Sequence, residues 1–324
     1  MSDLPTQIHI TEEGPREGFQ IESADIPASS KVAFINALSE TGVGTIQICS
    51  FVSPRLVPGW ADADEVAASF TPREQVNYTA LWFNQRGIDR AVGLRDRLKL
   101  TGTIHLAASE LFSQSNLNRD REGNLAAMRE QTAAHQRAGI EVSKISVMAA
   151  FGCNFAGDIS VDDVLVSVAD GFAIAAEADA TINEIALADT MGWAHPQKIQ
   201  QVVGAVRERW PDVALRLHLH DTRGLGIANA YAALAMGVDR FDSTAGGLGG
   251  CPFAAHPGAP GNIATEELVM LAHELGIETG VDLDALIEAG HMAETIVGHS
   301  LPSATLRGGS LSRYRTEASS RSAS

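Results

Sequence analysis

The stretch PQKIQQVVGAVRERWPDVALRLHLHDTRG, Pro196 to Gly224, contains the unit from which the fold is built. Its first half begins with proline, as helix N-termini often do, and repeats apolar residues at intervals of three and four. Its second half is an apolar β-type run, Val213 to Leu219, that ends in polar residues. The stretch therefore predicts a helix followed by a buried strand.

The same alternation of strand and helix recurs along the whole chain. Helical patterns such as SSKVAFINALSETG separate apolar runs at Gln7–Thr11, Gly44–Cys49, Val76–Phe83, Gly102–Ala107, Val142–Ala149, Ile182–Leu187, Val213–Leu219 and Val238–Ser243. Eight such units in 324 residues predict one (β/α)8 TIM barrel, a fold of roughly 250 residues, and an open doubly wound sheet is the alternative. We expect one barrel domain over residues 1–307 and a disordered tail over 308–324, where the sequence is polar and aperiodic.

The composition is that of a soluble globular protein and says little about small substrates. The chain is 45% apolar and 20% charged, and no apolar run reaches the ~18 residues of a membrane span. The start, MSDLPTQIHI, lacks a secretory signal, so a cytoplasmic location is expected. The net charge of −16 disfavours nucleic acid and membrane partners. Three widely spaced cysteines, Cys49, Cys153 and Cys251, argue against a disulfide framework and leave each one free to be a reactive thiol.

Residues that can carry chemistry gather at the ends of the predicted strands, where barrel enzymes place their active sites. In strand order they are Arg16 and Glu17, Gln47, the loop Ser109–Asn118, Cys153, Asp189, His218 and His220, and the long loop that carries Cys251 and Asn262. We therefore expect a site at the C-terminal mouth of the barrel.

The strongest single signal is the pair His218 and His220. Residues i and i+2 of a strand point to the same side, so the two imidazoles face one place. With a carboxylate and an amide oxygen they form a mixed nitrogen and oxygen shell, which suits Mg²⁺ or Mn²⁺ better than structural zinc. The alternative is that one histidine is a hydrogen-bonded core residue and the other binds a carboxylate.

Two further clusters add to this site. In GPREGFQ, Arg16 and Glu17 form either a surface ion pair or, beside the histidines, an oxyanion donor and an anionic metal ligand. The glycine-rich segment from Ser243 to Asn262 lacks the spacing of a dinucleotide site and favours a lid with Cys251 at its tip. Alternatively, Cys251 is a small buried residue and Asn262 is the N-cap of the next helix.

Six motifs in order resemble the hydroxymethylglutaryl-CoA lyase family of the DRE-TIM metallolyase superfamily. They are GPREGFQ, SFVSPRLVP, AASELFSQSN, ALADTMG, HLHDTRG, and GGLGGCPFA with GNIATE, and the resemblance runs from about Ile8 to Gly290. It implies a homodimeric (β/α)8 barrel with a divalent cation at its mouth. It also implies retro-aldol cleavage of a tertiary 3-hydroxyacyl-CoA to acetyl-CoA and a keto acid.

Carried over by position, the resemblance assigns roles to individual residues. Metal ligation falls to Glu17, His218, His220 and Asn262. Arg16 stabilises the oxyanion, Cys251 delivers a proton to the enolate, and Asp189 orients the site or relays protons.

Two positions depart from the family pattern. Glu17 stands where the family has aspartate, and Gln47 stands where it has a strand-two glutamate. Glutamine forms hydrogen bonds but cannot take a proton or pair with Arg16 as a carboxylate would. The family binds coenzyme A phosphates near its basic C-terminal region, where VGHSLPSATLRGG has Arg307 as its only basic side chain. A lyase acting on a citramalyl-type thioester or a free hydroxy acid therefore remains an alternative, as does a catalytically silent member that binds a metabolite.

Overall fold

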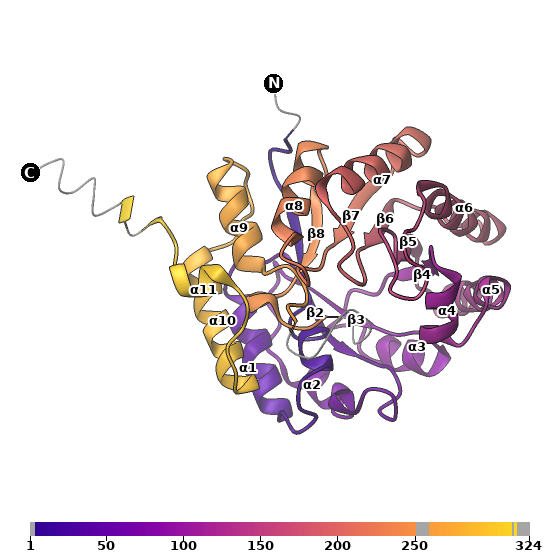
Figure 1. Cartoon of the computed structure of the whole chain (residues 1–324). Coiled ribbons are helices and arrows are strands. Elements are labelled where there is room, and N and C mark those ends of the chain that lie inside the picture. Colours follow the sequence, from indigo (N-terminus) through magenta and orange to yellow (C-terminus); the bar gives the residue numbers. More distant parts are fainter. Residues whose placement is uncertain (1–3, 251–258, 313, 316–324) are drawn as a thin grey trace, which may run out of the picture.

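The computed structural model describes residues 4–250, 259–312, 314 and 315, and it shows a ring of helices around parallel strands (Figure 1). All eight strands join one sheet in the order β3-β2-β1-β8-β7-β6-β5-β4, and every pairing is parallel. The strands are β1 (His9–Glu12), β2 (Thr45–Ser50), β3 (Asn77–Leu81), β4 (Gly102–Ala107), β5 (Val142–Met148), β6 (Glu184–Ala188), β7 (Ala214–His218) and β8 (Arg240–Ser243). Each of the eight predicted strands is confirmed.

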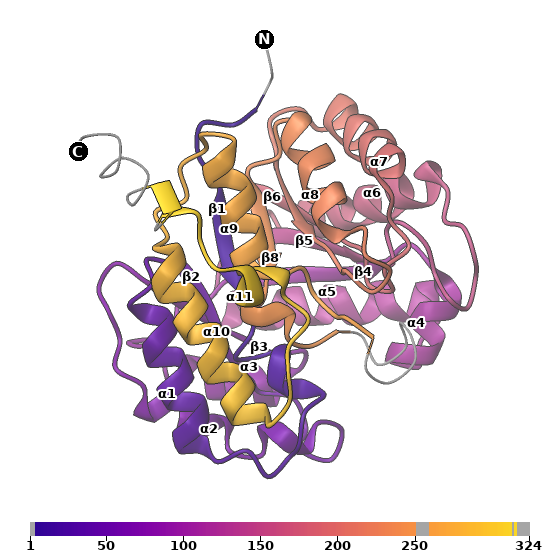
Figure 2. The same cartoon turned by 60° about the vertical axis from the view of Figure 1, so that its left-hand side comes forward.

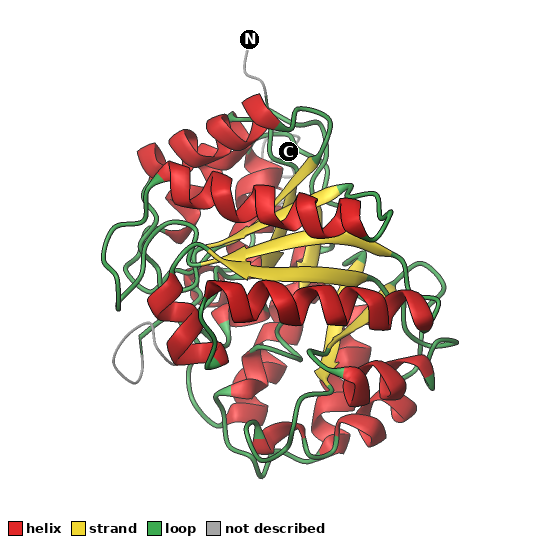
Figure 3. Cartoon of the chain, turned by 90° about the vertical axis from the view of Figure 1, so that its right-hand side faces the viewer, coloured by secondary structure: helices red, strands yellow, loops and turns green. Residues whose placement is uncertain are grey.

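Helices cover the outer face of the curled sheet, as the side view in Figure 3 shows. They are α1 (Ala28–Ser39), α2 (Ala63–Ser69), α3 (Gln85–Val92), α4 (Glu110–Leu117), α5 (Arg121–Arg137), α6 (Val161–Glu177), α7 (Pro196–Arg209), α8 (Gly226–Ala235), α9 (Thr265–Glu274), α10 (Leu283–Val297) and α11 (Ala304–Gly308). Three short 3₁₀ helices are η1 (Gly18–Gln20), η2 (Pro58–Trp60) and η3 (Ala245–Gly247). Helix α10 packs against α1, so the last part of the chain completes the ring of helices beside the first helix (Figure 2). The predicted TIM barrel is confirmed. Within the described part of the chain, no helix is long and apolar enough to cross a membrane.

The main apolar layer lies between strands and helices, while the barrel interior is polar. Ile46 and Ile48 of β2 are fully buried toward the helices, whereas Thr45 and Gln47 line an internal cavity of about 590 Å³. Branched aliphatic residues usually fill the inside of a TIM barrel. Here polar and charged side chains, among them Glu13, Arg216 and Asp242, line the space instead.

A network of ion pairs crosses this interior around Glu184, which is 2% exposed. Its carboxylate accepts from Lys144 Nζ at 2.8 Å, Arg216 Nε at 3.0 Å and Arg240 Nη1 at 2.7 Å. Arg216 also donates to Asp242 Oδ1 at 3.0 Å. Burial opposes ionisation of Glu184, but the attraction of the surrounding cations is larger and holds the pKa of Glu184 far below its usual range. We refer to Lys144, Glu184, Arg216 and Arg240 as the interior network.

The segment after β4 differs from the sequence prediction. Ser109 to Asn118 is not a loop, because residues 110–117 form α4. The Ser109 side chain accepts a hydrogen bond from Phe112 N at 3.2 Å and so caps the first turn. The prediction was wrong because capping by a serine was overlooked in a polar stretch.

The predicted tail falls mostly outside the described residues. Of its described part, Ser312 donates to Asp284 at 3.1 Å and Arg315 pairs with Glu274 at 2.7 Å. These contacts connect residues 312 and 315 to α10 and α9.

Candidate active site

The turn after β1 carries Arg16 and Glu17 to the barrel mouth. Glu13 N donates to Ser243 O at 2.8 Å, and Glu17 N donates back to Glu13 O at 2.7 Å, which makes the turn tight. Trp60 Nε1, from η2, donates to Arg16 O at 3.1 Å. The backbone of this turn is therefore fixed from both sides, and the two charged side chains have little freedom of position.

The end of β7 supplies the two histidines. His218 is the last residue of the strand, and His220 lies two residues further in an isolated bridge to Asn262. His220 Nδ1 lies 2.7 Å from the backbone oxygen of Asp189. Because a carbonyl oxygen can only accept a hydrogen bond, the ring proton lies on Nδ1. This leaves Nε2 of His220 as a lone-pair donor, an arrangement common for metal-bound histidines.

The segment after the glycine-rich loop carries Asn262 beside the histidines. Ile263 N donates to Leu219 O at 3.1 Å and Asp221 N donates to Gly261 O at 2.7 Å, so this segment pairs with the end of β7. A side chain at Gly261 would meet Gly249 O at 1.5 Å, so only glycine permits this approach. The helix that follows starts at Thr265, so the alternative reading of Asn262 as its N-cap is wrong.

These segments bring four predicted site residues together. Glu17 Oε1 lies 3.5 Å from His218 Nε2, 3.4 Å from His220 Nε2 and 3.1 Å from Asn262 Nδ2. The two imidazole rings are nearly perpendicular, with centroids 5.1 Å apart. Four donor groups from three distant parts of the sequence thus surround one point.

The charges at this point are strongly coupled. Burial opposes the charged forms of both Glu17 and His218, but each is the other's leading attractive charge. The pKa of Glu17 is accordingly held well below its usual range, with Arg16 contributing, and that of His218 well above its usual range. These shifts favour the charged forms of both groups, and a divalent cation would compete with the proton on His218.

The donor set fits a divalent cation. One ligand atom from each of Glu17, His218 and His220 lies within 4.8 Å of the others. Oδ1 of Asn262, a residue only 1% exposed, has no hydrogen-bond partner among the described residues. A buried carbonyl oxygen without a partner is costly, and ligation would satisfy it.

A second group, Glu13 with His218 and Asp242, also has its ligand atoms within 4.8 Å of one another. Its carboxylates are already engaged, because Glu13 pairs with Arg16 and Asp242 pairs with Arg216. Glu17 also pairs with Arg16, so what distinguishes the first group is the neighbouring Asn262 Oδ1, which has no partner among the described residues.

Arg16 is surrounded by three acceptors. Its Nε donates to Gln47 Oε1, its Nη2 to Glu13 Oε2, and its Nη1 lies 2.9 Å from Glu17 Oε2. A guanidinium has five N–H groups, so two remain for a ligand. The structure thus brings Gln47 into the site as a partner of Arg16.

Asp189 lies just behind His220. Its Oδ1 accepts from Trp193 N at 2.7 Å and Ala194 N at 3.1 Å, whereas Oδ2 has no partner among the described residues. Burial raises the pKa of this carboxyl above its ordinary value. Such a carboxyl suits proton transfer.

The structure describes two of the three cysteines that were predicted to be possible reactive thiols. Cys49 and Cys153 are buried free thiols, and burial raises the pKa of Cys49 far above its usual range. A reactive thiol at Cys49 is therefore wrong, because nucleophilic cysteines need an accessible thiolate. Cys251 lies outside the described residues.

Two buried carboxylates hold the start of the glycine-rich segment. Glu12 accepts from Gly14 N at 2.7 Å, Ala245 N at 2.9 Å and Thr265 Oγ1 at 2.5 Å. Glu266 accepts from Gly246 N at 2.9 Å. Burial raises the pKa of Glu12 to about 7 and that of Glu266 to about 8.

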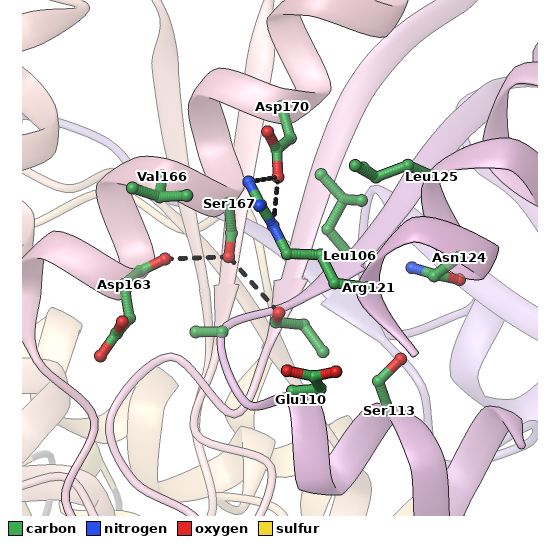
Figure 4. Close-up of a pocket in the computed structure, with 12 residues that line it drawn as sticks. Leu106, Glu110, Ser113, Arg121, Asn124, Leu125, Asp163, Val166, Ser167 and Asp170 are labelled. Atoms are coloured by element: carbon green, nitrogen blue, oxygen red, sulfur yellow. Dashed lines mark hydrogen bonds and ion pairs between the residues drawn. The ribbon is translucent and has the colours of Figure 1, made fainter. Parts of the chain in front are cut away.

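A separate pocket of about 260 Å³ lies between α4, α5 and α6 (Figure 4). Its one basic side chain, Arg121, pairs with Asp170 at 2.6 Å, and Glu110 and Asp163 also line it. This acidic lining does not suit a phosphate. Glu110 and Ser113 of the predicted segment Ser109–Asn118 line this pocket, whereas the candidate metal ligands and Arg16 do not.

Sequence reasoning missed two residues that contact the site, Glu13 and Asp242. Asp242 Oδ2 lies 3.5 Å from His218 Nδ1, on the ring edge opposite Glu17. A usable signal was present for both. Each points into the barrel at the C-terminal end of a strand, because Glu13 continues the inward series of His9 and Thr11, and Asp242 follows Arg240 by two.

Comparison with known proteins shows the family to which this chain belongs. The HMGL-like family model matches residues 7–293. Hydroxymethylglutaryl-CoA lyase YngG of Bacillus subtilis is 35% identical, covering 94% of this chain and 97% of its own. An (R)-citramalyl-CoA lyase of Chloroflexus aurantiacus is 39% identical, over 91% of this chain and 92% of its own. An HMG-CoA lyase from Acinetobacter baumannii, solved with coenzyme A and 3-methylmalate, is 36% identical with a TM-score of 0.84, covering 95% of this chain and 96% of that one. The chain therefore belongs to the HMGL-like family of carbon–carbon lyases.

Proposed function

We propose that this lyase cleaves 3-hydroxy-3-methylglutaryl-CoA, or a closely related tertiary 3-hydroxyacyl-CoA, by retro-aldol chemistry to acetyl-CoA and a keto acid, with Mg²⁺ or Mn²⁺ as its cation. The observation that carries the proposal is the convergence of Glu17, His218 and His220 beside Arg16 and Asn262, whose Oδ1 has no partner among the described residues. Oxygen and imidazole donors of this kind suit these cations.

Different residues of the chain are assigned different steps of the reaction. A bound divalent cation supplies Lewis-acid stabilisation of a negatively charged oxygen. Arg16 directs its two remaining N–H groups at the oxygen on which enolate charge develops. Asp189 Oδ2 is the atom we assign to holding and relaying a proton, since it is buried and unpartnered within the described part of the chain. Cys251 is assigned the delivery of a proton to the enolate carbon.

The relatives support a coenzyme A thioester as substrate. Hydroxymethylglutaryl-CoA lyases and an (R)-citramalyl-CoA lyase resemble this chain at similar identity, 35% and 39%. Citramalyl-CoA is therefore the second candidate. Both substrates contain a tertiary alcohol whose cleavage requires the same cation and oxyanion donor. The homodimer and the cytoplasmic location stay predictions.

The experiment that tests the proposal is turnover of the purified protein with 3-hydroxy-3-methylglutaryl-CoA, (R)-citramalyl-CoA and the corresponding free acids. Each substrate is assayed with EDTA, Mg²⁺ and Mn²⁺, and acetyl-CoA and keto acid are followed by chromatography. We expect cation-dependent release of acetyl-CoA from one thioester and no turnover of the free acids. A Cys251→Ala variant that still binds Mn²⁺ but loses turnover would support the assigned proton donor.

Either of two results contradicts the proposal. One is cleavage that persists fully in EDTA with no bound metal. The other is a protein that binds Mn²⁺ yet cleaves none of the four substrates.

A further inference from the structure

The guanidinium of Arg16 is held by two groups that have no place in the cation shell. Gln47 Oε1 accepts from Nε, and Glu13 Oε2 accepts from Nη2. The third partner, Glu17, faces both histidines as well as Arg16. Since Gln47 is neutral, Glu13 is the one carboxylate among these partners that is not also a proposed metal ligand.

We propose that Glu13 is the positioning residue of this lyase, the carboxylate that fixes the plane of Arg16 and so aims its free N–H groups at the substrate. This inference rests on the proposed role of Arg16 as oxyanion donor. The inward-facing position at the end of a strand brings Glu13 to the site, and the contact with Arg16 indicates what it does there.

The location of Glu13 suits this role. It directly follows β1, its N–H bonds to Ser243 O at 2.8 Å, and its carbonyl accepts from Glu17 N at 2.7 Å. The residue is 5% exposed. A carboxylate on so rigid a backbone can hold a planar cation in one orientation, because arginine recognises oxygens through a fixed fork of N–H groups.

Glu13 and Gln47 hold different nitrogen atoms of the same guanidinium. Gln47 contacts Nε, while Glu13 contacts Nη2, so together they define the plane of the group. Removing the charge at Glu13 leaves Glu17 as the only carboxylate in the described part of the chain that pairs with Arg16. Arg16 would then turn toward Glu17, away from the position that a developing oxyanion requires.

The same geometry predicts that the charge can be moved. A carboxylate placed at position 47 would reach Arg16 from the Nε side, because Gln47 Oε1 already touches that atom. The double variant Glu13→Gln, Gln47→Glu therefore preserves both the number of carboxylates and their contact with Arg16. The single variant Gln47→Glu instead gives one guanidinium three carboxylate partners.

The test is a double-mutant cycle of wild type, Glu13→Gln, Gln47→Glu and the double variant. We expect Glu13→Gln to lower kcat about 100-fold, the cost of a misplaced catalytic group, with KM and Mn²⁺ affinity within about threefold of wild type. The double variant should recover at least about tenfold of that loss in kcat. Glu13→Asp, which keeps the charge, should lose less than Glu13→Gln.

Glu184→Gln is the matched control, because it removes a buried carboxylate of the barrel interior that does not touch Arg16. Its kcat should stay within about threefold of wild type. Crystal structures of wild type and Glu13→Gln give a readout independent of turnover, in which the Arg16 guanidinium should leave its contact with Gln47.

Three outcomes would overturn the inference. In the first, Glu13→Gln keeps wild-type kcat and an unmoved Arg16. In the second, it loses Mn²⁺ binding together with turnover, which would make Glu13 part of the cation site. In the third, the double variant is no more active than Glu13→Gln. If wild type itself binds Mn²⁺ but cleaves none of the candidate substrates, the proposed function has failed, and the crystal structures alone decide whether Glu13 positions Arg16.

Discussion

Two clusters of charge lie inside this barrel, and they differ in what they leave unsatisfied. In the interior network, both oxygens of Glu184 accept from cationic side chains. At the mouth, Glu13 and Glu17 share the single guanidinium of Arg16, and Asn262 Oδ1 has no partner among the described residues. The interior network therefore leaves neither oxygen of Glu184 without a partner, whereas the mouth leaves an oxygen acceptor unused among the described residues.

The difference teaches how a structural ion network is told from a binding site. Both clusters are buried, and both shift the pKa of a carboxyl group strongly. Only the mouth combines spare oxygen acceptors with two imidazole nitrogens that face the same carboxylate. Oxygen and nitrogen atoms with unused lone pairs, rather than a pKa shift, therefore distinguish a candidate cation site from a structural ion network.

The largest expected effect on turnover comes from a substitution that disrupts the cluster at the barrel mouth. His220→Ala removes one nitrogen donor, and we expect turnover to fall about 1,000-fold or more, since a metal ion supplies several kcal/mol of transition-state stabilisation. Mn²⁺ binding, measured by calorimetry, should weaken in parallel, while circular dichroism should remain that of wild type. Undiminished Mn²⁺ affinity would remove His220 from the shell.

The corresponding change in the interior network should affect stability instead. Glu184→Gln leaves three cationic groups without their shared carboxylate, and loss of one partner of a buried ion pair costs about 3 kcal/mol. Urea unfolding at pH 7 measures this loss, and kcat of the folded variant should stay within about threefold of wild type. A large loss of kcat with unchanged stability would reverse the distinction between the two clusters.

Asn262 tests the role of the spare acceptor. Asn262→Ala should weaken Mn²⁺ binding about 10- to 100-fold, a smaller loss than for His220→Ala, because a neutral oxygen donor is removed. Asn262→Asp keeps an oxygen at the site and should bind Mn²⁺ more tightly than Asn262→Ala. Equal affinities of wild type and Asn262→Ala, measured by calorimetry, would exclude Asn262 as a ligand.

The smallest expected effect concerns Glu266. Burial raises the pKa of this carboxyl group from 4.5 to about 8. The folded protein therefore binds a proton more tightly than the unfolded chain, so this group's contribution to stability is present below about pH 4.5 and is lost as the pH rises through 8. Glu266→Gln should flatten the fall in unfolding free energy, which is at most about 1.4 kcal/mol per pH unit for one group. Urea unfolding at pH 5, 6.5 and 8 checks this, and parallel curves for the two proteins would refute it.

The sequence predicted the fold well because its signals are local. Apolar runs that alternate with helical periodicity identify strands within a few residues, and eight such units leave few compact arrangements. Local patterns failed where a capping hydrogen bond decided the outcome, as at Ser109 before α4. The positions of His218 and His220 followed from the period of a strand, since two residues restore the same side.

By itself, then, the sequence determined the barrel, the end at which its chemistry gathers, and the residue types available there. Only the tertiary structure decided which of them meet. Glu17, His220 and Asn262 come from three separate segments, and the close approach of Gly249 and Gly261 is a contact between distant backbones. The role of Glu13 is likewise invisible in the sequence, because whether a buried carboxylate pairs with arginine or with a cation depends on distances in space that chain order does not contain.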